Sequence, residues 1–129
     1  MDRENGIRYT QFTGKELYTL MFNAEHEGAF VSCIRGRFCA TLDDFFREIS
    51  ASMRFPDYFG WNWAAFDECI TDLEWLKFSS LLIVIEDFDL LFKKDRKKHV
   101  EKQLLEKYLN LAAEYWTSQN IPISILLNE

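Results

Sequence analysis

Residues 55–76 combine acidic and aromatic side chains in a pattern that suits binding to a positively charged surface. Five carboxylates lie between Arg54 and Lys77, and no basic residue interrupts them. Carboxylates accept charge-assisted hydrogen bonds from Arg, Lys or protonated His, and large rings add contact area at a small loss of conformational entropy. The segment therefore predicts a surface that fits a cationic cleft. A helix that only keeps its charges in water would show the same spacing, and this simpler interpretation stays open.

A loop with three aromatic residues precedes the helix predicted in this segment. Tyr58, Phe59 and Trp61 lie in the loop, where helical periodicity does not explain them. Gly60 permits a turn that a side chain would obstruct, and Asn62 is placed to cap the first turn of the helix. The rings are therefore expected to supply apolar contact to a partner or to hold the loop in place.

The helix itself is predicted over residues 63–74. At about 100° per residue, its buried face gathers Phe66, Cys69, Ile70, Leu73 and Leu76. The opposite face presents Ala64, Glu68, Thr71 and Trp75, with Asp67 and Asp72 at its sides. The exposed carboxylates are thus expected to share one helix surface next to the aromatic loop.

The rest of the chain alternates between predicted strands and helices. Strands are expected over residues 28–34, 79–86 and 121–127, and the middle one is a nearly continuous apolar run typical of a strand covered on both faces. A helix capped by Thr41 and ended by Phe55-Pro56 is expected to pack on the strands through Leu42, Phe45, Phe46, Ile49 and Met53. A long helix over residues 95–118 has one apolar stripe that consists of Val100, Leu104, Tyr108, Leu111 and Tyr115.

The connections between these strands are long enough for parallel pairing, which needs about a dozen residues or more. The predicted fold class is therefore α/β, with a small three-stranded parallel sheet, packed helices and right-handed connections. Residues 28–129 form one domain, and residues 1–27 form an N-terminal extension packed on it or preceding it. Within the extension, the alternation of residues 7–12 favours a short strand, and Thr13 with Glu16 predicts a capping box at a helix start.

The composition limits the function classes that remain. The 129-residue chain is 48% hydrophobic and 16% aromatic, and its net charge of −6 argues against a general nucleic-acid or anionic-membrane binder. The longest apolar run, residues 81–85, is far short of a membrane span, so a soluble, cytoplasmic protein is expected. Cys33, Cys39 and Cys69 show no metal-binding spacing and are interpreted as reduced packing residues.

No catalytic or metal-binding motif stands out elsewhere. Glu86, Asp87 and Asp89 cluster where the middle strand ends, and solvated loop acids are favoured over a magnesium site because such a site would need more ligands, and no recognisable metal loop or nearby histidine accompanies them. The basic run at residues 93–99 is interpreted as a solvated helix start, since no Gly-rich loop or stacking platform accompanies it. His26 and His99 lie in no nucleophile or acid–base motif. The sequence therefore predicts neither an enzyme nor a cofactor or metal site.

Several motifs in residues 55–73 match one known family. They are the run Phe-Pro-Asp-Tyr-Phe-Gly at residues 55–60, then Asn62-Trp63, Cys69 and Asp72-Leu73. By these motifs, and by the downstream order of apolar strand, long helix and final strand, residues 28–129 resemble the barstar family of intracellular ribonuclease inhibitors. The resemblance implies a three-stranded parallel sheet, no catalytic activity, and a helix that plugs the active site of a secreted-type ribonuclease together with its preceding loop.

The resemblance also implies roles for single residues. Tyr58 and Phe59 stand where the family has loop aromatics, and Asn62 stands where it has a polar contact residue. Glu68 stands where the family has an aspartate that mimics a substrate phosphate. Ala64 departs from the family, which typically has an aspartate there, and Asp67 is a candidate replacement. The expected binding site comprises Tyr58, Phe59, Gly60, Asn62, Trp63, Ala64, Asp67, Glu68, Thr71 and Asp72.

The predicted function is that of an immunity protein or antitoxin. Such a protein would block a basic extracellular-type ribonuclease, or a related toxin domain, in a 1:1 complex. It is expected to bind no nucleic acid directly and no membrane, and to be a monomer when free. A non-inhibitory interaction or regulatory module with the same fold is the alternative.

Overall fold

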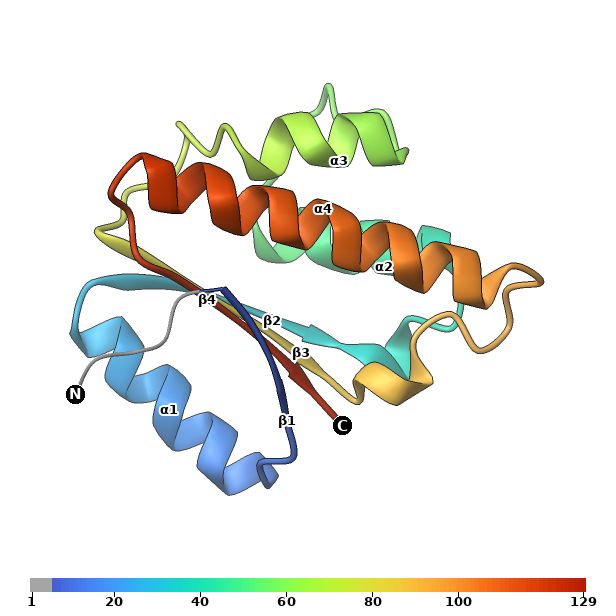
Figure 1. Cartoon of the computed structure of the whole chain (residues 1–129), viewed down its shortest axis with the longest axis horizontal. Helices are drawn as coiled ribbons and strands as arrows, with labels where there is room; N and C mark the ends of the chain where they lie inside the picture. Colours follow the sequence, from blue (N-terminus) through green and yellow to red (C-terminus); the bar gives the residue numbers. More distant parts are fainter. Residues whose placement is uncertain (1–5) are drawn as a thin grey trace.

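Four parallel strands form one sheet in the structure, a computed structural model that describes residues 6–129 (Figure 1). The strand order is β1-β4-β3-β2. The strands are β1 (Gly6–Thr10), β2 (Ala29–Arg35), β3 (Ser80–Glu86) and β4 (Ile123–Asn128), and the helices are α1 (Gly14–His26), α2 (Leu42–Ser52), α3 (Trp63–Ile70) and α4 (Lys98–Ser118). The predicted α/β class, with helices packed on one parallel sheet, is confirmed.

β1 is a fourth strand and corrects the predicted three-stranded sheet. It pairs in parallel with β4, with Ile7 beside Ile125 and Tyr9 beside Leu127. The alternation of residues 7–12 predicted a strand but no partner for it, because the pairing joins residues that lie almost a full chain length apart. The side chain of Ile7 packs against the large core, so β1 covers the edge of β4 instead of preceding the sheet.

Both faces of the sheet are covered by helices (Figure 1). α2, α3 and α4 cover one face, and α1 covers the other. In β3, the side chains of Leu81, Ile83 and Ile85 join the large core, whereas Leu82 and Val84 join the smaller cluster with α1. This alternation is expected for a central strand whose two faces are both covered by helices.

Capping residues fix where α1 and α2 begin. The Thr13 hydroxyl accepts a hydrogen bond from the Glu16 N–H at 3.1 Å, and the Glu16 carboxylate accepts one from the Thr13 N–H at 2.9 Å. The predicted capping box is therefore confirmed. Thr41 and Asp44 form the same arrangement at the start of α2. The predicted core face of α2 is buried through Phe45, Phe46 and Ile49, and Met53 is buried just after it.

α4 packs on the sheet with a different face from its predicted apolar stripe. Its buried side chains are Leu105, Leu109, Ala112, Ala113 and Trp116. Val100, Leu111 and Tyr115 of the predicted stripe are 48%, 41% and 40% exposed. The helix carries two apolar stripes, and the small alanine side chains allow the second one to approach the sheet closely. Helical spacing alone does not report which stripe faces the sheet, so the predicted core face of this helix is wrong.

The cysteines are packing residues, as predicted. All three are free thiols, with Cys39 and Cys69 buried and Cys33 half-buried. Among residues 6–129, no helix has both the length and the apolar character needed to span a membrane.

Candidate protein-binding site

The loop between α2 and α3 is anchored by one of its own aromatic residues. Phe59 is only 6% exposed, and its ring centroid lies 5.5 Å from that of Phe46 and 5.1 Å from that of Phe55. By contrast, Tyr58 is 66% exposed and Trp61 is 46% exposed. Of the predicted contact residues in the loop, Phe59 therefore holds the loop to the core, whereas Tyr58 is accessible to a partner.

Asn62 sets the junction between the loop and α3. Its Oδ1 accepts a hydrogen bond from the Ala65 N–H at 2.8 Å, and its Nδ2 donates to the Gly60 carbonyl at 3.0 Å. The predicted N-cap is confirmed. The left-handed backbone of the turn falls at Trp61, with φ 55°. Gly60 matters for a different reason, which is close packing: a Cβ at this position would lie only 3.3 Å from Asn62 Nδ2.

Trp63 joins α3 to α4. Its Nε1 donates a hydrogen bond to Glu101 Oε2 at 3.1 Å, and its ring stacks on that of Tyr108 with centroids 5.7 Å apart and planes at 9°. The Trp63 ring also forms T-shaped pairs with the rings of Phe46 and Phe66, with centroids 5.2 and 5.6 Å apart. Trp63 is therefore a half-buried residue whose main contacts fix the position of α3 against α4.

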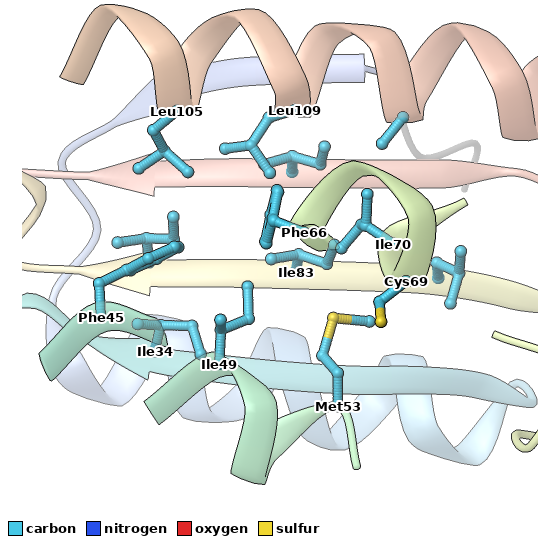
Figure 2. Close-up of a cluster of buried hydrophobic side chains, with 14 of the residues drawn as sticks. Ile34, Phe45, Ile49, Met53, Phe66, Cys69, Ile70, Ile83, Leu105 and Leu109 are labelled. Atoms are coloured by element: carbon cyan, nitrogen blue, oxygen red, sulfur yellow. The ribbon is translucent and has the colours of Figure 1, made fainter. Parts of the chain in front are cut away.

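α3 separates a buried face from an exposed face, as its spacing predicts. Phe66, Cys69, Ile70, Leu73 and Leu76 are all buried. Figure 2 shows the side chains of Cys69 and Met53 meeting in this core, with Phe66 and Ile70 directed toward the strands. The accessible side chains of α3 and its loop form a surface that we call the α3 face: Tyr58, Trp61, Ala64, Asp67, Glu68, Thr71 and Asp72. Asp67 and Thr71 are half-buried there, and the other members are exposed.

α3 ends at Ile70, earlier than the predicted residue 74. Thr71 is the C-cap, and both its N–H and its hydroxyl donate to the Asp67 carbonyl, at 3.3 and 2.7 Å. Leu73 has φ 52°, a left-handed conformation through which a right-handed helix cannot continue. Asp72 consequently lies just beyond the helix, still exposed at the end of the α3 face.

Trp75 belongs to the fold and not to the exposed face of the helix. Its Nε1 donates a hydrogen bond to the Met53 carbonyl at 2.9 Å, and its ring lies 6.2 Å from that of Phe55. The prediction that it points outward is wrong because the chain has left helical geometry before residue 75. Trp75 instead ties the segment after α3 to the end of α2.

Negative charge is concentrated around the Tyr58 ring. Partial desolvation raises the pKa of the Tyr58 phenol, and the charge of Asp72 raises it further, with smaller contributions from Cys69, Glu74 and Glu68. Burial, followed by the same Asp72 and Glu68 charges, raises the pKa of the Cys69 thiol. Both shifts have the direction that burial and neighbouring negative charge produce.

Three carboxylates of the α3 face, those of Asp67, Glu68 and Asp72, lie within six residues of one another on one accessible surface. In the part of the chain that the structure describes, residues 6–129, no ion pair involves Asp67, Glu68 or Asp72. Some acids elsewhere do have such a partner; for example, Asp87 Oδ2 lies 3.0 Å from Arg37 Nη1. The α3 carboxylates are therefore available to a cationic group of another molecule.

The acids that follow β3 have structural partners. Arg37 Nη1 lies 3.0 Å from Asp87 Oδ2 and 3.6 Å from Glu86 Oε1, and Cys33 Sγ donates to Glu86 Oε2 at 2.9 Å. Burial and the Glu86 carboxylate raise the pKa of the Cys33 thiol to about 12, which keeps it protonated at neutral pH. Within residues 6–129, no group of three His, Cys, Asp or Glu side chains is placed to hold a metal ion.

Two residues that position the site were missed from the sequence. Glu101 and Tyr108 hold the Trp63 ring, yet Glu101 lies 38 positions away in the chain and stands out in no local motif. Tyr108 belonged to the predicted stripe of α4, but nothing in the spacing indicated a contact with α3. Only the packing of α4 beside α3 brings these side chains together.

Comparison with known protein families gives a match to the family of barstar, described as a barnase inhibitor. The match covers residues 29–128, that is, from the start of β2 to the end of β4. β1 and α1 lie outside the matched region. No curated protein is significantly similar to the chain.

Proposed function

The chain belongs to the barstar family, and we propose that it inhibits a basic ribonuclease of the extracellular type, or a related toxin domain. In this proposal it acts inside the cell as an immunity protein or antitoxin. It binds its target in a 1:1 complex and catalyses no reaction of its own. The α3 face is the binding surface.

The unpaired charge of the α3 face carries the proposal. Asp67, Glu68 and Asp72 share the α3 face with the exposed rings of Tyr58 and Trp61, and no described residue between 6 and 129 forms an ion pair with them. An enzyme that cleaves RNA binds a polyanion, so its cleft presents cations to the phosphates. Carboxylates held in a fixed array can occupy the positions of those phosphates and exclude the substrate.

The residues of the site divide into two groups by the contacts that they make within the fold. Glu68 is the central anchor in this proposal, with Asp67 and Asp72 at its sides. Tyr58 and Trp61 add apolar contact, and Ala64 and Thr71 complete the surface between the charges. The other predicted site residues, Phe59, Gly60, Asn62 and Trp63, act by holding this surface in place through the contacts described above.

This arrangement favours rapid association through a binding surface that is already ordered in the free protein. The N-cap at Asn62 and the packing of Phe59 and Trp63 order the loop and the helix before a partner arrives, so little conformational entropy remains to be lost. The opposite charges of the two surfaces attract each other at a distance. The association rate should therefore fall steeply with salt, while the dissociation rate changes little.

Asp67 is proposed to replace the family aspartate that Ala64 lacks. It lies three residues further along α3, which corresponds to about 60° around the helix. In the barnase–barstar complex, close charge pairs across the interface have coupling energies of about 1.5–7 kcal/mol. That range gives the scale of the binding energy that a carboxylate at Asp67 could restore. Asp67→Ala should weaken binding of the partner far more than Asp57→Ala, an exposed acid of the loop. Equal effects of the two substitutions would reject this role.

A non-inhibitory interaction module is the second candidate, and Ala64 is the observation that favours it. Losing one carboxylate from the centre of the surface can weaken a charged interface by several orders of magnitude. A chain that kept the fold but gave up ribonuclease binding would show this kind of departure. Its partner would still present a basic surface to the α3 face.

An inhibition titration tests the proposal. The full-length chain is titrated into barnase as the first probe, and then into any ribonuclease recovered with the tagged chain, while RNA cleavage is followed by fluorescence. Cleavage by the cognate enzyme should stop near one chain per enzyme, and Glu68→Gln should shift the titration strongly. The matched control is Glu25→Gln, an exposed acid of α1 on the other side of the sheet, which should change nothing. A recovered partner that is not a ribonuclease would favour the second candidate.

A further inference from the structure

The flank of α4 carries an apolar stripe that the fold leaves partly uncovered, although Tyr108 within it stacks on Trp63 of α3. Val100, Leu111 and Tyr115 are 48%, 41% and 40% exposed, and Leu104 and Tyr108 between them are half-buried. We call these five residues the α4 stripe. Figure 1 shows α4 running beside α3 in the helical layer. Exposed apolar side chains that gather in one stripe typically mark an interaction site, whereas scattered ones do not.

The spacing of the α4 stripe is that of a helix–helix seam. Leu104, Tyr108, Leu111 and Tyr115 follow one another at intervals of four, three and four residues, the a/d pattern of a heptad. At about 1.5 Å per residue, the stripe from Val100 to Tyr115 is about 22 Å long. A second helix of similar length therefore fits along it by inserting its side chains between those of the stripe.

Two charged residues indicate which helix fits. Lys107 and Glu114 lie one heptad apart at the exposed border of the stripe, in g positions. Within residues 6–129, neither side chain has an ion-pair partner, although Lys107 Nζ lies 5.5 Å from the Tyr108 ring. In an antiparallel pair of α4 helices with a two-fold axis near Leu111, each Lys107 lies opposite the other copy's Glu114. In a parallel pair, g positions face the partner's e positions, so Lys107 would lie opposite Ala112 and Glu114 opposite Gln119, and neither would meet an opposite charge.

We infer that the α4 stripe is a self-association surface, on which a second copy of this chain docks antiparallel through Leu111 and pairs its Lys107 with Glu114 of the first copy. The interface is isologous, so it closes as a dimer and does not propagate into a filament. Its footprint is one face of one helix, which is the size range of weak and reversible complexes. The inference departs from the predicted free monomer because the structure turns this stripe outward. It does not depend on the proposed ribonuclease.

Sedimentation equilibrium of the full chain under reducing conditions tests the inference. Between about 10 and about 500 µM, the average mass should rise from that of the monomer toward twice that value, with a dissociation constant on the order of 100 µM. Leu111→Asp should keep the chain monomeric over the whole range. Tyr18→Asp is the matched control, because Tyr18 is a 66% exposed aromatic residue on α1, and it should leave the equilibrium unchanged.

A charge swap adds a second readout at exposed positions that do not affect folding. Lys107→Glu alone and Glu114→Lys alone should each weaken the dimer by about threefold to tenfold. The double substitution should restore the original affinity, because it exchanges the two charges of each pair. Recovery in the double variant is specific to antiparallel pairing and would not follow from a general change in net charge.

Three results would overturn the inference. The first is a chain that remains monomeric at the highest concentration. The second is a dimer that Leu111→Asp leaves intact or that Tyr18→Asp dissociates, since either result would place the interface elsewhere. The third is a double charge variant that associates no better than the single variants.

Discussion

Phe59→Ala and Tyr58→Ala are expected to separate the stability of the binding site from its affinity. Phe59 is 6% exposed, and its ring lies 5.5, 5.1 and 5.8 Å from those of Phe46, Phe55 and Trp61. Truncation of a buried Phe to Ala typically removes about 3–5 kcal/mol of stability, part of it from aromatic pairs worth about 0.5–1.5 kcal/mol each. Because a loop can partly collapse into the space left behind, we expect the lower end for Phe59→Ala, about 3 kcal/mol.

Thermal unfolding and ribonuclease binding measure the two effects separately. For a chain of this length, a loss of about 3 kcal/mol lowers the melting temperature by about 10 °C. Tyr58 is 66% exposed, so Tyr58→Ala should change the free energy of unfolding by no more than about 0.5 kcal/mol while it weakens binding. Binding is compared by calorimetry at a temperature where both variants are folded.

The roles of the two neighbouring residues would be refuted by the opposite pattern. If Phe59→Ala left the melting temperature within a few degrees of wild type and weakened binding as Tyr58→Ala does, Phe59 would be a contact residue. Phe59→Leu provides the folding control, because it retains most of the buried apolar volume and should recover much of the lost stability.

Three further predictions concern stability. A Cβ at Gly36 would press on the backbone oxygens of residues 86 and 87, so Gly36→Ala should lower the free energy of urea unfolding by about 2–3 kcal/mol, whereas Gly14→Ala, with no atom within 4 Å of its Cβ, should not lower it. Asn62→Ala should cost about 1 kcal/mol in the same assay, since it removes the cap of α3, and no loss would contradict the capping role. The pKa of the Cys33 thiol is raised from 9.0 to about 12, so its contribution to stability is fully present below pH 9 and is lost as pH rises toward 12. Urea unfolding at a series of pH values should show this decline, and Cys33→Ala should reduce its slope.

The local features of the site could be predicted from the sequence because they depend on neighbouring residues. The cap at Asn62 and the buried face of α3 are set within two helical turns, and helical spacing reports them directly. The capping box of Thr13 and Glu16 is local in the same way. The early end of α3 was not predicted, because the left-handed turn at Leu73 carries no glycine to mark it.

The remaining features depend on contacts between distant parts of the chain. The pairing of β1 with β4 joins the two ends of the chain, and the hydrogen bond from Trp63 to Glu101 joins two helices. Sequence spacing indicated one apolar stripe on α4, but the structure turns a different one, which includes Leu105, Leu109 and Trp116, toward the sheet. Phe59 and Tyr58 are adjacent aromatics, and only the position of α2 determines which of them is buried.

The salt dependence of association with the cognate ribonuclease tests most directly whether the α3 carboxylates engage a cationic cleft. Stopped-flow rates are measured for the wild type and for the double variant Asp67→Asn with Glu68→Gln. The wild-type association rate should fall steeply with salt, and the double variant should lose at least about 100-fold in affinity together with much of that salt dependence. A double variant that binds and associates as the wild type does at every salt concentration would contradict the account.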